Sequence, residues 1–173
     1  LTLLSFSQIT ARNKDWNSRF SLYKNDIKKL PNSAKAHSLL GTEYVAKADS
    51  ISRVPGSSHV LYMGYIDSAI LEFESGIGVY DGYFNCANNA GALLFSRKKD
   101  YARAKPFFSK ALEYKPTYVE ALFNYGSCLE SDYKGIVELQ KILSVINLDS
   151  LAEFDVSNIK DVSSYQNEIK AAY

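Results

Sequence analysis

One stretch of this chain occurs twice with identical spacing. Both copies share an Asp–aromatic pair, two large apolar residues and a proline: Asp15-Trp16, Tyr23, Ile27 and Pro31, and Asp100-Tyr101, Phe108, Leu112 and Pro116. A glycine follows each proline at the same offset, Gly41 in the first copy and Gly126 in the second. Because the residue before a proline avoids the helical conformation, each proline ends one helix and the pattern after it begins another. The chain is therefore predicted to be all-α, a stack of repeated helix pairs, which is typical of a binding protein.

The cleanest repeat unit spans residues 84–117. Apolar residues three and four apart mark its two helices, on either side of a turn at 98–100: Ala87, Ala90, Gly91 and Leu94, then Tyr101, Ala104, Phe108, Ala111 and Leu112. We expect Gly91 and Ala104 to be small because the two helices cross closely there. Phe108 is expected to fill the space between successive pairs. Pro106 is expected in about the first turn of the second helix, where a missing N–H costs little.

The preceding unit carries an insertion. Its Gly41 and Ala69 are 28 residues apart, whereas the corresponding residues of the cleanest unit are 13 apart. About four helical turns of extra chain therefore lie at residues 49–62. A Pro-Gly-Ser-Ser run inside this segment predicts a loop, with Ser57 or Ser58 capping the next helix. The insertion either folds over the stack as a lid or lengthens a helix.

The units at the two ends are less regular. Residues 17–30 have the pattern of a second helix whose first helix is missing or lies within 1–12. The last unit starts at Val119, and its second helix is expected around an apolar stripe at 136–146. Two short helices, which form a capping pair or one closing helix, are expected at 150–154 and 162–173. The expected total is about three helix pairs plus terminal helices.

These features resemble the tetratricopeptide repeat (TPR), a helix–turn–helix unit of about 34 residues. The matches are to its Leu-Gly, Tyr, Ala-x-x-x-Phe and Pro signature: Leu40-Gly41, Tyr44, Ala69, Phe73, Gly91, Ala104, Phe108, Pro116 and Gly126. The signature Trp is replaced by His37, Ala87 or Leu122. The resemblance implies that residues 15–173 form a single right-handed TPR-like solenoid with an insertion at about 49–62.

A narrower resemblance concerns the run Arg12-Asn13-Lys14-Asp15-Trp16, followed by Leu22-Tyr23 and Pro31-Asn32-Ser33-Ala34-Lys35. It is similar to the junction between the last membrane helix and the C-terminal TPR array in multi-spanning membrane glycosyltransferases of the transmembrane-and-TPR O-mannosyltransferase type, and in related bacterial membrane proteins. The resemblance implies that residues 1–14 are the end of a membrane helix; the alternative is part of an earlier repeat. It also implies a location outside the cytoplasm, with a cytoplasmic location as the alternative.

The composition and the motifs argue against several functions. With 20 Lys and Arg against 19 Asp and Glu, the net charge of +1 gives no general attraction to nucleic acid or to an anionic membrane. His37 and His59 have no partner at metal-ligand spacing, and no nucleophile stands beside a base. His37 is expected to pack in the core, and Cys86 and Cys128 are expected to be unpaired, at least half-buried residues. We therefore expect no enzyme activity, no cofactor and no metal site.

Binding of a protein or an extended peptide is the leading hypothesis. In a TPR stack the first helices line a concave groove, and the repeat register assigns these residues to it: Thr42, Asn85, Asn88, Asn89, Ala92, Phe123, Asn124 and Ser127. Asn89 and Asn124 occupy the same repeat position 35 residues apart. An asparagine side chain both donates and accepts, so it can pair with a peptide amide, and the hypothesis rests on Asn88, Asn89 and Asn124.

Other readings of the groove differ in their partners. The positions that clamp a terminal carboxylate in some TPR grooves carry no cation here, which argues against acidic C-terminal tails: Ser38, Asn88, Glu120 and Asn124. One alternative function is an accessory domain of a membrane glycosyltransferase that positions a polypeptide acceptor. Another is a structural or oligomerisation spacer whose concave face is buried against a second copy.

Overall fold

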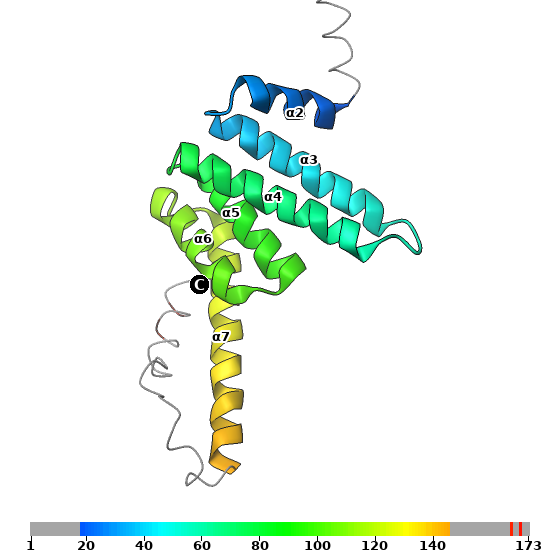
Figure 1. Ribbon diagram of the computed structural model, residues 1–173. Helices are drawn as coiled ribbons and strands as arrows, with labels where there is room; N and C mark the ends of the chain where they lie inside the picture. Colours follow the sequence, from blue (N-terminus) through cyan, green and yellow to red (C-terminus); the bar gives the residue numbers. More distant parts are fainter. Residues whose placement is uncertain (1–17, 146–166, 168–169, 171–173) are drawn as a thin grey trace, which may run out of the picture.

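The computed structural model describes residues 18–145, 167 and 170, and its regular structure over those residues is entirely helical (Figure 1). The helices follow in the order α2 (Arg19–Lys29), α3 (Ala34–Ser52), α4 (His59–Val79), α5 (Phe84–Leu93), the π-helical turn η1 (Leu94–Lys98), α6 (Tyr101–Tyr114) and α7 (Val119–Val145). Each helix packs against the next one along the chain. The expectations for residues 1–14, 150–154 and most of 162–173 fall outside the described residues.

Short polar side chains mark where the helices begin. In four of the described helices an oxygen of the preceding Ser or Asp accepts a hydrogen bond from the backbone N–H of the third helical residue: Ser18 from Ser21, Ser33 from Ala36, Ser58 from Leu61 and Asp100 from Arg103. Such a bond satisfies one of the N–H groups that a helix start leaves without a partner. The predicted cap at Ser58 is thereby confirmed.

The same packing contact occurs inside each of the two helix pairs, α3–α4 and α5–α6. A Cβ built on Gly41 would stand 2.8 Å from Phe73 Cε1, and a Cβ built on Gly91 would stand 2.8 Å from Phe108 Cε1. Each phenylalanine ring therefore lies against helix backbone that only glycine exposes, and both rings are buried. The expectation that Phe108 fills the space between pairs is corrected, because its ring occupies the space that Gly91 leaves inside its own pair.

The two pairs meet at Gly76 on α4. A Cβ at this position would lie 2.8 Å from Cys86 Sγ on α5 and 3.3 Å from the Ala34 carbonyl oxygen on α3. Three helices thus converge on a residue without a side chain. Cys86 and Cys128 are both buried and unpaired, as predicted.

The insertion lengthens two helices and does not form a lid. α3 has 19 residues and α4 has 21, whereas α5 has 10 and α6 has 14. Only residues 53–58 leave the helical conformation between α3 and α4. Figure 1 shows the turn between these helices extending past the end of α5.

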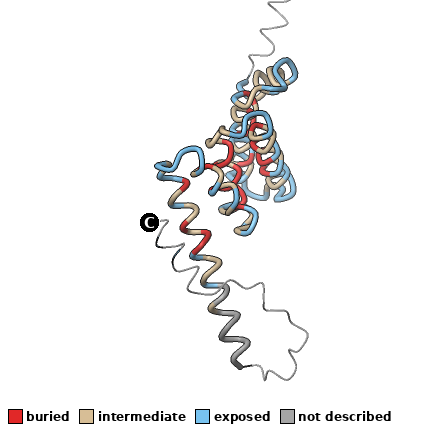
Figure 2. Tube along the Cα trace, turned by 90° about the vertical axis from the view of Figure 1, so that its left-hand side faces the viewer, coloured by how far each residue is buried: buried red, intermediate tan, exposed pale blue. Residues whose placement is uncertain are grey.

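The last predicted pair is a single helix. α7 continues from Val119 to Val145 without the turn expected before residue 136. No proline interrupts the segment, and the Glu130 carboxylate pairs with Lys134 Nζ one turn later at 2.7 Å, which supports helix continuation. Figure 1 shows the second half of α7 leaving the stack, and Figure 2 shows buried residues along its first half.

Pro106 lies deeper in its helix than predicted. It is the sixth residue of α6, beyond the first turn, so the helix loses one backbone hydrogen bond to the carbonyl of Ala102. Both residues are exposed, and water can therefore satisfy that carbonyl. None of the helices in the described part of the chain combines the length and the apolar character needed to cross a membrane.

Candidate functional site

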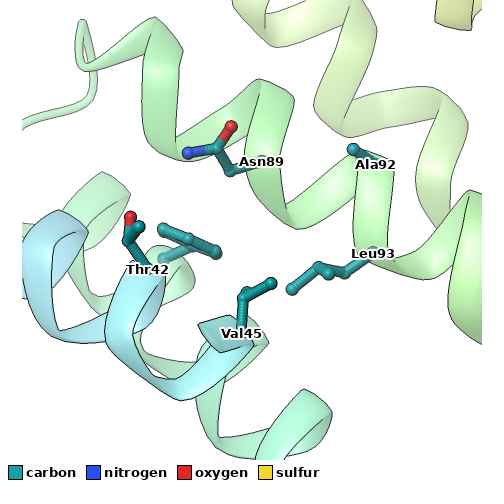
Figure 3. Close-up of a pocket in the computed structure, with 6 residues that line it drawn as sticks. Thr42, Val45, Asn89, Ala92 and Leu93 are labelled. Carbon is teal, nitrogen blue, oxygen red and sulfur yellow. The ribbon is translucent and has the colours of Figure 1, made fainter. Parts of the chain in front are cut away.

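A cavity of about 230 Å³ opens between α3 and α5 (Figure 3). The side chains that line it come from three helices: Thr42 and Val45 from α3, Phe73 from α4, and Asn89, Ala92 and Leu93 from α5. In Figure 3, Thr42 and Val45 face Asn89, Ala92 and Leu93 across the space between the two helices. The first helices of the two pairs therefore form opposite walls of one site.

The cavity is apolar with a polar edge. Phe73 and Leu93 are almost fully buried, with 1% and 6% of their surfaces exposed. At the edge, the Thr42 hydroxyl donates a hydrogen bond of 2.9 Å to the Ser38 carbonyl, which leaves its oxygen free to accept. Within the described residues the Asn89 side chain makes no hydrogen bond, so its amide is available both to donate and to accept. The site can hold an apolar group and bind a polar group beside it.

Contacts between the walls bound the cavity at both ends. One turn before Thr42 and Asn89, Ser38 on α3 lies close enough to Cys86 on α5 to act on the pKa of its thiol. One turn after Val45 and Leu93, Arg97 Nη2 on η1 pairs with Asp49 Oδ1 on α3 at 2.9 Å. These contacts lie beyond the two ends of the cavity lining. The space between them is large enough for one side chain.

Burial controls the chemistry of the cysteine next to this site. Burial raises the pKa of the Cys86 thiol to about 11, and the hydrogen bond from Ser38 offsets only part of that effect. A thiol with this pKa is almost entirely protonated near neutral pH, and it is a poor nucleophile. Cys86 therefore serves as a small packing residue.

The predicted site residues separate into two groups. Thr42, Asn89 and Ala92 line the cavity, whereas Asn85, Asn124 and Ser127 are half-buried and lie outside its lining. The Ser127 hydroxyl donates to the Phe123 carbonyl of its own helix at 2.9 Å. The structure thus brings together one predicted residue of the first unit and two of the second, but neither Asn85 of the second unit nor the residues of the third.

Asn88 was predicted to face the groove, and the structure corrects this. Only 6% of its surface is exposed, and its Oδ1 has no hydrogen-bond partner within the described residues. Helix α5 contacts α4, α6 and α7, and six of its ten residues are buried. Fewer residues of α5 therefore reach the cavity than the repeat register predicts.

Sequence reasoning missed the apolar part of the site. Val45 is three residues after Thr42, and Leu93 is four residues after Asn89, so each shares a helix face with a predicted residue. This spacing was the sequence signal from which Val45 and Leu93 could have been predicted. Phe73 was recognised only as part of the repeat signature, but it both fills the space at Gly41 and lines the cavity.

The remaining polar clusters have structural roles. His37 Nδ1 lies 2.7 Å from Glu72 Oε2, and its Nε2 lies 3.0 Å from the Pro31 carbonyl oxygen, so both ring nitrogens are engaged. His37 therefore links α3 to α4 and to the turn before α3.

Within residues 18–145, 167 and 170, no group of three or more His, Cys, Asp or Glu side chains is arranged to hold a metal ion. No family model and no curated protein matches this chain.

Proposed function

We propose that this chain is a TPR-like, non-catalytic interaction module that holds an extended polypeptide segment at the cavity between α3 and α5. The observation that carries the proposal is the meeting of Thr42 and Asn89, from two successive pairs, at one apolar cavity. The repeated Gly–Phe contact inside each pair supports the TPR-like assignment, because it recurs with the same geometry in both units. A partner segment gains an apolar contact and a polar contact at the same place.

The size of the cavity fits one apolar side chain. An engineered protein cavity of about 150 Å³ holds benzene, so a space of about 230 Å³ accommodates a Phe or Leu side chain. Burying such a side chain contributes about 1.5–3 kcal/mol. One hydrogen bond from Asn89 to a peptide amide adds about 1 kcal/mol. A single residue is therefore expected to bind weakly, and a longer segment adds contacts along the first helices.

Small probes test the site directly. We expect N-acetyl-phenylalanine methylamide to shift the backbone NMR signals of Thr42, Val45 and Asn89 in the intact chain, with a Kd of about 1 mM or weaker. N-acetyl-alanine methylamide should not do so, because it presents the same amides without the large side chain. Equal shifts from both probes, or shifts elsewhere on the surface only, would contradict the proposal.

Two matched variants separate the cavity from the rest of the fold. Ala92→Phe fills the cavity and should abolish probe binding, whereas Ala102→Phe adds the same side chain to the exposed face of α6 and should not. Asn89→Ala should weaken binding several-fold and leave the unfolding transition nearly unchanged. Probe binding that survives Ala92→Phe in a folded protein places the peptide elsewhere.

A second candidate function is an oligomerisation element, which two exposed apolar residues of α7 favour. Val119 and Phe123 are 71% and 63% exposed and lie one helical turn apart. A second copy would cover them. Sedimentation of the chain and of its Phe123→Ser variant decides this candidate: a dimer that dissociates on substitution supports it, and a monomer at high concentration removes it.

A further inference from the structure

The long hairpin of α3 and α4 ends in a tip that the second helix pair does not cover. Asp49 on α3 pairs with Arg97, and Asp67 on α4 pairs with Lys98. These two ion pairs mark where η1 rests on the hairpin. The chain between them, residues 50–66, is defined here as the hairpin tip, and Figure 1 shows its turn away from α5 and α6.

The hairpin tip exposes apolar side chains and contains no carboxylate. Val54, Val60 and Leu61 are 58%, 82% and 51% exposed. No Asp or Glu occurs from residue 50 to residue 66, and Arg53 and His59 are the ionisable groups of basic character in this range. Although the whole chain is nearly neutral, residues 50–66 carry a positive charge and no carboxylate, and the flanking carboxylates of Asp49 and Asp67 are paired with Arg97 and Lys98.

The surface of α4 beside the turn carries a shallow depression. A depression of about 430 Å³ is lined by Ser58, Val60, Leu61, Gly64, Tyr65 and Ser68, all from this one helix and its cap. Nothing lies within 4 Å of the place where a Cβ on Gly64 would stand. The His59 and Tyr62 rings stack with centroids 6.0 Å apart. Tyr62 thus adds an aromatic ring with a polar hydroxyl at the edge of the depression.

These features fit a lipid surface better than a protein partner. A specific protein interface buries about 800 Å² on each partner around a well-packed centre, but the hairpin tip offers three apolar side chains and a depression with one wall. A membrane interface needs less: apolar side chains that reach the acyl boundary and a cation that attracts anionic headgroups. Tyrosine is also favoured at the headgroup level.

We propose that the hairpin tip docks peripherally on an anionic membrane, with Val54, Val60 and Leu61 inserted at the interface and Arg53 beside the lipid phosphates. This contact is separate from the cavity between α3 and α5. A peptide held in that cavity and a membrane held at the tip occupy different faces of the α3–α4 pair, so either proposal stands without the other.

Vesicle binding tests the proposal with the full chain. We expect co-sedimentation with phosphatidylcholine vesicles that contain phosphatidylserine, weaker binding to phosphatidylcholine alone, and a decrease with added salt. The double substitution Val60→Glu and Leu61→Glu should lower the partition coefficient about tenfold or more. Leu30→Glu and Leu71→Glu, which alter exposed apolar residues outside the tip, should leave it unchanged.

A fluorescent reporter makes the test specific for the tip. The chain has one Trp, Trp16, so a Trp16→Phe background permits a single reporter at Val60→Trp or, as the control, at the exposed residue Leu71→Trp. Anionic vesicles should shift the emission of the first reporter to the blue and not that of the second. Residues 1–15 are present in every variant, so any vesicle binding that they cause is common to all, and the difference between variants reports on the tip. An unshifted Val60→Trp reporter overturns the proposal, as does a partition coefficient that the Glu substitutions leave unchanged. Circular dichroism verifies that each variant is folded.

Discussion

Gly91 and the ring of Phe108 are in direct contact inside the α5–α6 pair, and Gly41 and Phe73 repeat this contact inside α3–α4. In both pairs a Cβ on the glycine would stand 2.8 Å from Cε1, 3.0 Å from Cδ1 and 3.0 Å from Cζ of the phenylalanine. Identical distances in two hairpins of very different length show that the contact has the same geometry in both pairs. The hairpin length varies independently of it.

Alanine at position 91 should therefore destabilise the fold. Although alanine favours helix over glycine by about 1 kcal/mol, the ring of buried Phe108 must move, and overpacking of a core costs about 1–3 kcal/mol. Gly64→Ala is the matched control, because its Cβ meets nothing within 4 Å and it should stabilise α4. Urea denaturation measures both variants. Equal stabilisation by the two substitutions would show that the contact at Gly91 is not tight.

The small residue Gly91 was correctly predicted to lie at a close approach within its pair, because such a pattern reflects local packing, whereas the large residue Phe108 was assigned to the space between pairs. Residues 136–146 carry an apolar stripe, but this spacing is the same in a new helix and in a continued one, so the continuity of α7 was not predictable. Asn88 shows a second limit. Its burial depends on how closely α4, α6 and α7 surround α5, which no spacing within α5 encodes.

The phenol of Tyr114 should ionise only at an unusually high pH. Its hydroxyl donates a hydrogen bond of 2.6 Å to Asp81 Oδ2, and this bond, followed by burial and the carboxylate charge, raises the pKa of Tyr114 to about 12 from an ordinary 10.0. Asp81→Asn removes the negative charge and should bring that pKa down toward 10.0. Ultraviolet titration of the phenolate, with Tyr114→Phe to assign the signal, measures it. An unchanged titration in Asp81→Asn would contradict the role of this contact.

The two cysteines should make the protein sensitive to alkaline pH. Burial raises the pKa of Cys86 to about 11 and that of Cys128 to about 12, from an ordinary 9.0. The folded state thus keeps protons that the unfolded chain releases, so their contribution to stability is complete below pH 9 and is lost as the pH rises toward 11–12. Urea midpoints across this range should fall, and Cys128→Ala should make the decline shallower. Tyr44 and Tyr118, whose pKa values are also raised by burial, account for part of the decline that remains.

The same thiols should react slowly in the folded protein. Both are buried and protonated near neutral pH, and the thiolate is the reactive form. Modification by iodoacetamide should therefore proceed only as fast as the protein opens and should accelerate on addition of urea. Rapid labelling of either cysteine in native buffer would show that its surroundings open readily.

Lys99 provides a test of backbone strain at the turn between η1 and α6. It adopts the left-handed conformation, with φ 56° and ψ 25°, at the C-terminal cap of η1. A side chain in this region costs about 1–2 kcal/mol, which glycine avoids. Glycine also enlarges the conformational freedom of the unfolded chain, so the net gain from Lys99→Gly should be about 0.5–1 kcal/mol.

The control is Lys98→Gly, one residue earlier, where the backbone is helical and Lys98 pairs with Asp67. That change should destabilise the protein by about 1 kcal/mol. Urea denaturation of the two variants should show shifts of opposite sign, and loss of stability in Lys99→Gly would indicate that the lysine side chain contributes more than its conformation costs.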